Sequence, residues 1–476
     1  MLFASFPFLF LFLPILVWLW KLTAGEDKAR LSVLLLGASL LFGACQGLEA
    51  LLLLLGLTVV NYLFGLLLAD EGHRRRRLGR RGLLLLAVLL NVLVWCRFRH
   101  LPALSAWLAQ WQDILPVLAP AAMPAGFSFA VLIQLAWLLG VYQRRIRPEG
   151  IVRQALFTTC FPYALSGPLV RYEEMGPQLD ALEVPQAEDL ARGLGLMVLG
   201  LAKKVLLADS LAPAADAVFH AAAQGLPLST AEAWLGALSY TFQIYFDFSG
   251  YTDMAVGAAL MLGLRLPENF AAPYKATGIV DFWRRWHMSL GTWFRDYVYI
   301  PLGGNRVGRA RQLLNILVVW MLTGFWHGAA WNFVVWGLMF AVLLIMEKLW
   351  LLKPLSKCRP LAHLYVVFFV VISFVIFNAE NMGQALSDIG GLFGAGGIPL
   401  VSAEAVYCLR SFALVLILAV LGATPLLRNG LVRLSQYPTA GKVLNALEPF
   451  TLFVLLLVMT GYLVDGSFNP FLYFRF

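Results

Sequence analysis

The chain has 476 residues, of which 60% are hydrophobic and 13% are charged, and its mean hydropathy is +0.77. This composition excludes a soluble globular enzyme and indicates a polytopic membrane protein. The net charge of +9 is concentrated in particular loops, which points to membrane topology and anionic lipid headgroups and not to nucleic acid.

Apolar segments recur along the whole chain without a long polar interruption, so we expect one all-α integral-membrane domain over residues 1–476. The N-terminal segment lacks a basic region and a small-residue cleavage site, which predicts a retained helix and not a signal peptide. Several segments are shorter than the roughly 20 residues of a straight span, which predicts short, tilted or re-entrant helices in a funnelled body. The predicted spans are 2–20, 31–45, 48–69, 82–97, 124–142, 190–208, 233–247, 251–265, 312–325, 328–350, 361–377, 409–423 and 448–464.

Two arginine-rich loops predict the topology of the first third of the chain. Residues 70–81 carry six arginines against two acids, and residues 143–153 carry four against one. Both loops should therefore lie on the cytoplasmic side. A full span over 102–119 would place the second loop outside, so this segment is predicted to lie as an amphipathic helix in the outer interface.

Two further stretches place helix-breaking or charged residues in apolar surroundings. Residues 161–175 contain two prolines, a glycine and a charge cluster, which fits either a re-entrant wall or an ordinary loop with solvated charges. Lys203 and Lys204 follow an apolar run; they are either snorkelling lysines at a helix end or part of a ligand site.

The segment 239–257 brings Asp247, Tyr251 and Asp253 into a membrane-like context. A carboxylate in such surroundings needs a partner. We expect an arginine of the 284–295 segment to supply it, in either a structural ion pair or a substrate-side role.

The stretch 281–332 contains two histidines, His287 and His327, inside or at the edge of hydrophobic segments. An ionisable group is costly to keep there and is a functional candidate. A continuous helix over 281–296 would turn His287 inward among aromatic residues. Near His327, glycines and alanines such as Gly324 allow a backbone or a ligand to approach closely.

An unperturbed imidazole titrates near pH 6.5 and burial favours its neutral form, which can accept a proton from an attacking hydroxyl as a general base. No third ligand accompanies the two histidines and the five cysteines lack CxxC spacing, so no metal site is predicted. The chain contains neither GxSxG nor GxxxxGK[ST], which argues against a serine hydrolase and a nucleotide-binding loop. The residues expected to line the substrate site are Trp283, Arg285, Trp326, Asn332, Asp247, Tyr251 and Asp253.

Several motifs carry a specific resemblance that covers nearly the whole chain. They are FDFSGYTDMAVGAALMLG, an NF pair followed by FWRRWHMSLGTWFRDYVYIPLGGNR, GFWHGAAWNFVVWG and the C-terminal FNPFLYFRF. Together they resemble the membrane-bound O-acyltransferase (MBOAT) family, in its alginate O-acetyltransferase-like branch. The chain departs from that branch at FNAEN, where an F-R-A element is expected, and at WCRFRH, where an F-K-Y element is frequent.

The resemblance implies that His327 matches the near-invariant catalytic histidine of the family and His287 its second active-site position. It further implies a cytoplasmic thioester donor, acetyl-CoA foremost, no bound cofactor, and delivery of the acetyl group to the outer side of a bacterial cytoplasmic (inner) membrane. The expected acceptor is an extracytoplasmic polysaccharide such as alginate, cellulose or peptidoglycan, reached directly or through a periplasmic SGNH-type acetyltransferase or esterase partner. Two alternatives remain open: D-alanyl transfer from a carrier protein to a teichoic acid, and a transporter that uses the histidines as a proton relay.

Overall fold

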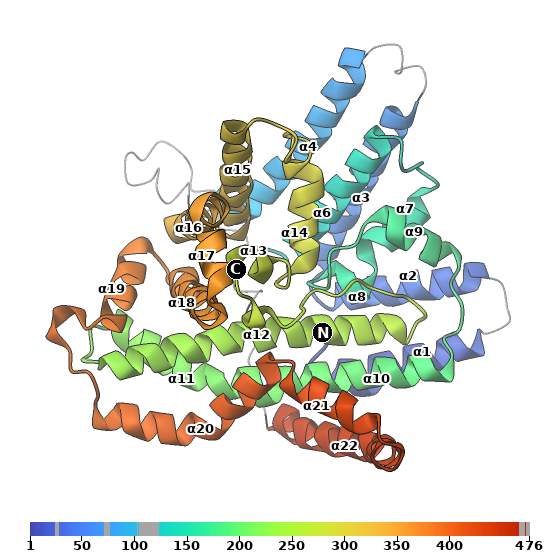
Figure 1. Cartoon of the computed structure of the whole chain (residues 1–476). Coiled ribbons are helices and arrows are strands. Elements are labelled where there is room, and N and C mark those ends of the chain that lie inside the picture. Colours follow the sequence, from blue (N-terminus) through green and yellow to red (C-terminus); the bar gives the residue numbers. More distant parts are fainter. Residues whose placement is uncertain (24–27, 71–76, 102, 104–122, 466–471, 473–476) are drawn as a thin grey trace. The chain divides into compact units, whose positions relative to one another are not determined.

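The computed structural model describes residues 1–23, 28–70, 77–101, 103, 123–465 and 472, and every regular element among them is helical (Figure 1). The all-α prediction is therefore confirmed for the described residues. The predicted interfacial helix 102–119 lies outside them, apart from residue 103. The chain forms two compact units, 1–197 with 252–268 and 198–251 with 269–476. The expectation of a single domain stays a prediction.

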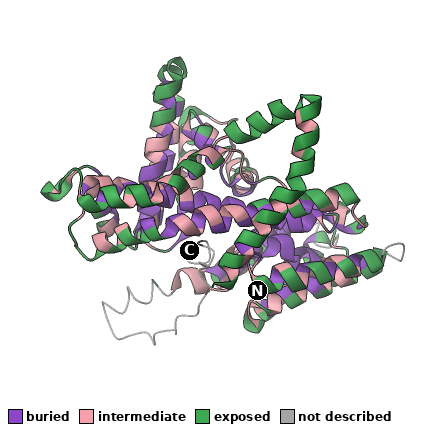
Figure 2. Cartoon of the chain, turned by 90° about the horizontal axis from the view of Figure 1, so that it is seen from below, coloured by how far each residue is buried: buried purple, intermediate pink, exposed green. Residues whose placement is uncertain are grey.

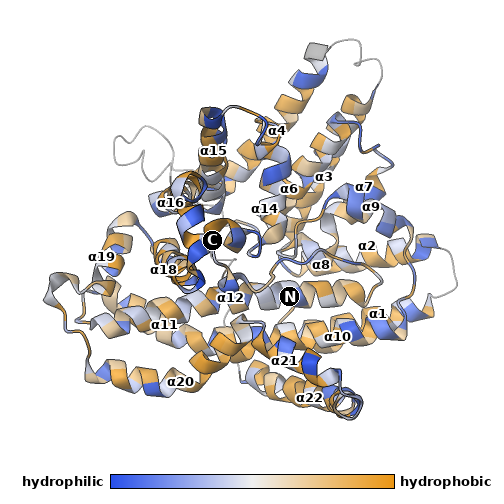
Figure 3. Cartoon of the chain, in the orientation of Figure 1, coloured by the Kyte–Doolittle hydropathy of each residue, from blue (hydrophilic) through white to orange (hydrophobic). Residues whose placement is uncertain are grey.

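Six helices are long and apolar enough to cross a membrane. Two of them, α20 (Ala403–Ala423) and α22 (Pro438–Val464), have few buried residues within the chain itself although they are strongly apolar (Figures 2 and 3). An exposed apolar surface of this size is expected to face lipid. The six candidate spans are Leu48–Ala69, Gly79–Arg99, Trp331–Lys357, Arg359–Asn378, Ala403–Ala423 and Pro438–Val464.

The first unit contains helices held by apolar and amide contacts. Phenylalanines from the N-terminus, α2 and α8 form a ring cluster that includes Phe8, Phe42 and Phe161. Within the helix packing, Asn61 and Asn91 exchange side-chain hydrogen bonds of 3.0 and 2.7 Å, as polar residues between membrane helices often do. The elements are η1 Phe8–Phe12, α1 Leu13–Leu22, α2 Lys28–Ala44, α3 Leu48–Ala69, α4 Arg77–Arg99, α6 Phe127–Tyr142, α7 Ile151–Thr159, α8 Phe161–Ala164, α9 Tyr172–Asp180 and the first part of α10, Ala187–Ala202.

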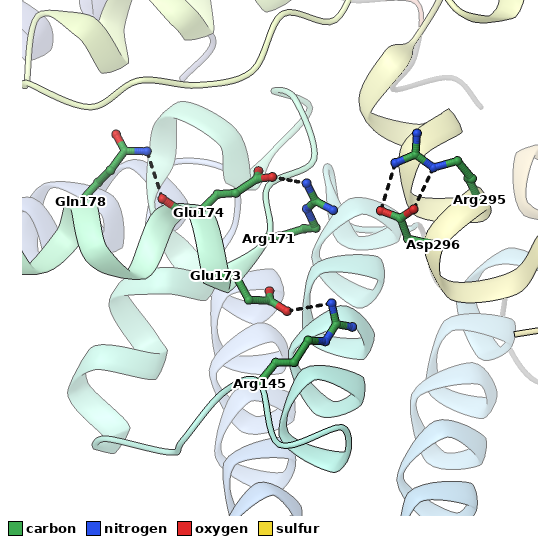
Figure 4. A network of polar contacts seen from close by, with 7 residues as sticks. All are labelled: Arg145, Arg171, Glu173, Glu174, Gln178, Arg295 and Asp296. Carbon is green, nitrogen blue, oxygen red and sulfur yellow. Dashed lines mark hydrogen bonds and ion pairs between the residues drawn. The ribbon is translucent and has the colours of Figure 1, made fainter. Parts of the chain in front are cut away.

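The proline-rich stretch of the first unit is a buried wall. All residues from 161 to 170 are buried, which fits the re-entrant interpretation better than a solvated loop. The charges that follow pair locally: Glu173 lies 3.4 Å from Arg145, and Arg171 pairs with Glu174 (Figure 4).

The second unit contains the two histidines. The helix α11 follows η3 and packs beside the first part of α12, where the rings of Phe219 and Tyr240 lie 5.9 Å apart. The α15–α16 hairpin packs beside α18 through α16. The elements are η3 Lys203–Ala208, α11 Asp209–Ala223, α12 Thr230–Leu260, η4 Pro273–Lys275, α13 Ile279–Trp283, α14 Met288–Phe294, η5 Arg295–Tyr299, α15 Arg309–His327, α16 Trp331–Met346, η6 Glu347–Leu351, α17 Leu352–Lys357, α18 Arg359–Asn378, α19 Met382–Leu392, η7 Ala395–Gly397, α20, α21 Leu426–Ser435 and α22.

Two predictions about helix boundaries are wrong. The expected spans 233–247 and 251–265 belong for the most part to one helix, α12. Its Gly250 does not make a turn; an added Cβ there would lie 2.5 Å from the carbonyl oxygen of Gly200, so the glycine permits close helix packing. The expected helix 281–296 is also interrupted, because α13 ends at Trp283 and α14 begins only at Met288.

Candidate functional site

The hairpin that carries His327 is closely packed. An added Cβ at Gly324 would lie 2.4 Å from the carbonyl oxygen of Phe333, and one at Gly337 would lie 2.3 Å from that of Trp320. Only glycine therefore fits at these two positions of α15 and α16. The prediction that small residues near His327 let backbones approach closely is confirmed.

His327 is the last residue of α15, and it is 5% exposed. Its ring lies edge-to-face against three aromatic rings, those of Trp326, Trp336 and Phe377, with centroid distances of 4.8, 5.1 and 5.2 Å. These rings come from α15, α16 and α18. The imidazole is thus enclosed by aromatic edges and faces contributed by three helices.

Asn332 holds the aromatic rings around His327 in place. Its side-chain nitrogen donates hydrogen bonds to the carbonyl oxygens of Ile376, at 3.2 Å, and Ala379, at 2.7 Å. The bonds join the start of α16 to the end of α18 and hold Phe377 in place beside His327. Asn332 therefore has a positioning role through its nitrogen; its predicted substrate contact stays a prediction.

Two tryptophans supply buried hydrogen-bond donors, and one of them, Trp336, lies beside His327. The Trp283 ring packs against Trp336, at 5.7 Å between centroids, and against Phe340, at 4.8 Å. The indole N–H groups of Trp283 and Trp336 are buried and find no acceptor among the described residues. Buried donors are nearly always paired, so these two are suited to the carbonyl oxygen of a bound ligand.

His287 lies on the non-helical backbone between α13 and α14. Its φ and ψ are 45° and 52°, and its side chain is 2% exposed. A residue with a Cβ rarely adopts this left-handed conformation, and such strain persists only where the surroundings enforce it. Here Asn269 enforces it: its carbonyl oxygen accepts from Met288 N–H at 3.0 Å, and its side-chain oxygen accepts from Ser289 N–H at 3.1 Å.

The same asparagine fixes the tautomer of His287. Asn269 Oδ1 must be an acceptor because it receives a backbone N–H, and His287 Nδ1 lies 3.3 Å from it. Nδ1 therefore carries the ring proton and donates it, which leaves the lone pair on Nε2. The ring also packs edge-to-face on Phe248 at 4.8 Å.

Burial lowers the pKa of His287 to about 3, well below the usual value near 6.5. The imidazole is therefore neutral at physiological pH and is a weak base. Its geometry suits it to hold a hydroxyl or a donor group through Nε2 and makes it a poor proton acceptor.

One aromatic cluster joins the surroundings of the two histidines. Every neighbouring pair along it has ring centroids within 5.8 Å, from Phe248 at the His287 end to Trp336 at the His327 end. A rigid apolar body of this kind excludes water. Its members, in order, are Phe248, Phe270, Trp286, Phe282, Trp283 and Trp336.

The predicted partner of Asp247 is wrong. Asp247 pairs with Lys204 at 2.8 Å, and Lys204 also pairs with Asp209 at 2.6 Å. Lys204 is buried, so it does not snorkel. Arg285 instead pairs with Asp281, at 2.9 Å, and Arg295 with Asp296. The arginines stay with acids of their own segment because these are one and four residues away.

Asp247 also receives a hydrogen bond of 2.7 Å from the backbone N–H of Leu472. Leu472, which belongs to the C-terminal motif singled out in the sequence, thus contacts the same ion cluster. Tyr251 is buried near the middle of α12, and Asp253 belongs to the part of α12 in the first unit. Their predicted substrate roles, and that of Trp326, stay predictions.

Sequence reasoning missed Asn269, Trp336 and Phe377. Asn269 stands in the NF pair of the motif, 18 residues before His287, and its capping role depends on a chain reversal that no periodicity shows. Trp336 and Phe377 look like ordinary apolar helix residues. Among the described residues no three His, Cys, Asp or Glu side chains gather into a possible metal site.

Comparison with known proteins agrees with this arrangement. The sequence pattern of the MBOAT, membrane-bound O-acyltransferase family, matches residues 81–382, a range that includes both histidines. The chain is 37% identical over 400 residues to the probable alginate O-acetylase AlgI of Azotobacter vinelandii, covering 83% of this chain and 79% of that protein. It is 34% identical to the peptidoglycan O-acetyltransferase of Helicobacter pylori, covering 83% and 80%. It is 31% identical to the teichoic acid D-alanyltransferase of Bacillus subtilis, covering 49% and 64%.

Proposed function

Because the chain belongs to the membrane-bound O-acyltransferase family and is a multi-pass membrane enzyme of that family, we propose that it transfers an acetyl group from acetyl-CoA to a hydroxyl of an extracytoplasmic polysaccharide. His327 acts as the general base in this proposal. The observation that carries it is the enclosure of His327 by three aromatic rings at the tip of the α15–α16 hairpin.

The charges at the ends of the hairpin support transfer across the membrane. Arg306, Arg309 and Arg311 stand at the start of α15, and Lys348 and Lys353 follow the end of α16. Basic residues favour the cytoplasmic side, so both open ends of the hairpin belong there. The tip with His327 then points toward the opposite face, where the acceptor arrives.

One general base is sufficient for the proposed acetyl transfer. His327 takes the proton of the acceptor hydroxyl as its oxygen attacks the thioester carbonyl, and the collapse of the adduct breaks the C–S bond. The proton then passes from His327 to the leaving thiolate, so the products are an acetyl ester and free CoA. General-base help of this kind contributes about 10²- to 10⁴-fold to the rate.

The other side chains orient the reactants. The lone pair of His287 Nε2 accepts a hydrogen bond from acceptor or donor, because Asn269 holds the proton on Nδ1. The indole N–H groups of Trp283 and Trp336 donate to the acyl oxygen as negative charge develops on it. The aromatic cluster keeps out water that would hydrolyse the thioester.

The names of the relatives support the acceptor class. The probable alginate O-acetylase and the peptidoglycan O-acetyltransferase are named for alginate and peptidoglycan, and each match covers 83% of the chain. The relative that transfers D-alanine matches only 49% of it. These names support our proposal that the enzyme lies in a bacterial inner membrane and acts on the polymer directly or through a periplasmic SGNH-type partner.

The test is acetyl transfer in sealed proteoliposomes. Acetyl-CoA labelled in the acetyl group is added outside, and oligosaccharides of cellulose, alginate or peptidoglycan type are enclosed within. Label that enters the lumen as an ester, with release of CoA outside, supports the proposal. Consumption of a D-alanyl carrier protein with no use of acetyl-CoA would contradict it and favour D-alanyl transfer.

A further inference from the structure

The first unit holds a cavity of about 560 Å³ at the ends of three helices. It lies where α3 and α6 end and α4 begins, and these three helices pack against one another (Figure 1). Three arginines and one acid line it, namely Arg80, Arg144, Arg147 and Asp70. Positive charge therefore predominates in its wall, which favours an anionic ligand.

Arg80 is held in place at this cavity. Its Nε donates a hydrogen bond of 3.2 Å to the carbonyl oxygen of Leu68, and its Nη2 donates one of 2.9 Å to that of Tyr142. Its guanidinium group also lies over the Tyr142 ring, 5.1 Å from the ring centre. These contacts join the ends of α3 and α6. They leave Nη1, which makes no hydrogen bond to the described residues, to bind a ligand.

Two more arginines of the wall have exposed side chains. Arg144 and Arg147 form no ion pair with the residues that the structure describes, whereas Arg145 between them turns to Glu173, at 3.4 Å (Figure 4). A guanidinium group on a long exposed side chain can turn toward a ligand, so Arg144 and Arg147 can join Arg80 on one anion. Guanidinium groups match phosphate through paired N–H donors.

Arg144 occupies a backbone position that usually belongs to glycine. It follows the last residues of α6 with a φ of 63°, and its N–H donates to the carbonyl oxygen of Val141 at 3.0 Å. A residue with a Cβ is strained in this left-handed conformation, whereas glycine is not. An arginine at such a position agrees with a use for its side chain.

The cavity belongs to the cytoplasmic end of its helices. The arginine-rich loops 70–81 and 143–153 both contribute to its wall, and the hydrogen bonds of Arg80 show that they lie at the same end. The positive-inside rule turns this end toward the cytoplasm. Both α3 and α4 are candidate spans. Leucines near this end of the two spans are exposed, which suits the acyl chains of a lipid; they are Leu63, Leu66, Leu67, Leu85, Leu86 and Leu89.

We propose that this cavity binds the headgroup phosphate of an anionic phospholipid of the phosphatidylglycerol type, drawn from the cytoplasmic leaflet. Arg80 donates to the phosphate from a fixed position, and Arg144 and Arg147 close on it from the 143–153 loop. Basic cavities between membrane helices on the cytoplasmic side suit such headgroups. A choline headgroup fits less well, because its ammonium group would approach the arginines. The exposed leucines beside the cavity favour a lipid over a soluble phosphate.

The test measures binding of short-chain phosphatidylglycerol to the full-length protein in an uncharged detergent. The wild type should bind it about tenfold more tightly than phosphatidylcholine with the same chains. Arg144→Gly and Arg147→Gln should each weaken phosphatidylglycerol binding about tenfold, because charge-assisted hydrogen bonds are lost. Arg81→Gln is the matched control and should bind as wild type does, since it removes an exposed arginine next to Arg80 that is outside the lining of the cavity.

Arg144→Gly also separates binding from folding. Glycine relieves the left-handed backbone, so this variant should unfold at the wild-type temperature or above it. A loss of lipid in a protein of that stability does not come from misfolding. Unchanged affinity in Arg144→Gly and Arg147→Gln would overturn the site. An equal loss in Arg81→Gln would also overturn it, because the lipid would then respond to surface charge in general.

Competition distinguishes a lipid from a soluble phosphate. Inorganic phosphate and CoA, each added at the concentration of the lipid, should leave the bound phosphatidylglycerol in place. Displacement by either one would overturn the lipid assignment and make the cavity a site for soluble phosphate compounds.

Discussion

The two histidines of the second unit are the same side chain in opposite surroundings. His287 is held by a network: a left-handed backbone, a hydrogen bond to Asn269 and a capped helix start. His327 ends a regular helix and meets three aromatic rings, with glycines packing its hairpin. The first arrangement fixes a proton on one nitrogen and keeps the ring neutral. The second encloses an imidazole among aromatic rings from three helices at the tip of the hairpin, where we propose that it accepts the proton of the acceptor.

Substituting each histidine in turn should give the largest effects, and these should differ between the two sites. His327→Gln should lower kcat by about 10²- to 10⁴-fold, because a general base is lost. His287→Gln should lower it less, since a glutamine can still make one hydrogen bond there. Initial rates of CoA release, with acetyl-CoA affinity measured separately, report both effects. Equal losses in the two variants would erase the distinction between base and positioning group.

The ion pairs of Lys204 with Asp209 and Asp247 lie in the same unit as the histidines, and we expect them to act on folding more than on the reaction. Lys204→Met would leave Asp209 and Asp247 buried without their cation, at a cost of about 3–5 kcal/mol. Asp247→Asn should cost less, since Lys204 keeps Asp209. Thermal unfolding and activity per folded molecule separate the two properties, with Lys203→Met as the neighbouring control. A stable but inactive Lys204→Met protein would give this cluster a chemical role.

Removing the Asn269 side chain, which holds His287 in place, should have a medium effect on stability and rate. Asn269→Ala deletes the acceptor for His287 Nδ1 and Ser289 N–H, which should destabilise the protein by about 1–3 kcal/mol. The freed imidazole can then change tautomer and orientation, so kcat should fall while acetyl-CoA affinity stays near that of wild type. A variant that loses stability but keeps its full kcat would show that the clamp does not matter for the reaction.

The acid dependence of stability tests whether His287 is neutral in the folded protein. The pKa of His287 is lowered to about 3 in the folded protein, so below pH 6.5 the unfolded chain binds a proton that the folded chain does not. Stability is therefore complete above pH 6.5 and falls by about 1.4 kcal/mol per pH unit as pH decreases toward 3. His287→Asn should remove this slope in thermal unfolding between pH 7 and 4.5. An unchanged slope would mean that His287 is already charged when folded.

The sequence was sufficient for the fold class and for the choice of the two histidines as candidates. Apolar runs and arginine-rich loops report the membrane directly, and ionisable residues in apolar surroundings stand out. The residues that surround the two histidines could not be predicted from the sequence. The break before His287 depends on Asn269, which is remote in sequence, and the partner of Asp247 is Lys204, 43 residues upstream and not an arginine of the expected helix.

The wrongly predicted helix boundaries also depend on contacts that are remote in the sequence. The segments 233–247 and 251–265 were predicted as two spans, but in α12 the missing Cβ of Gly250 makes room for the backbone at Gly200 and the helix continues. Glycine in a membrane helix serves close packing as often as it ends a helix, and only the neighbouring helix decides between the two.

Rescue of His327→Ala by added imidazole tests the central claim most directly. Acetyl-CoA consumption is measured with saturating acceptor while imidazole is increased from zero. If His327 is the base, the variant is about 10²- to 10⁴-fold slower than wild type without imidazole, and the rate rises with the concentration of neutral imidazole, whereas His287→Ala is not rescued. A His327→Ala protein that consumes acetyl-CoA at the wild-type rate without imidazole would contradict the account.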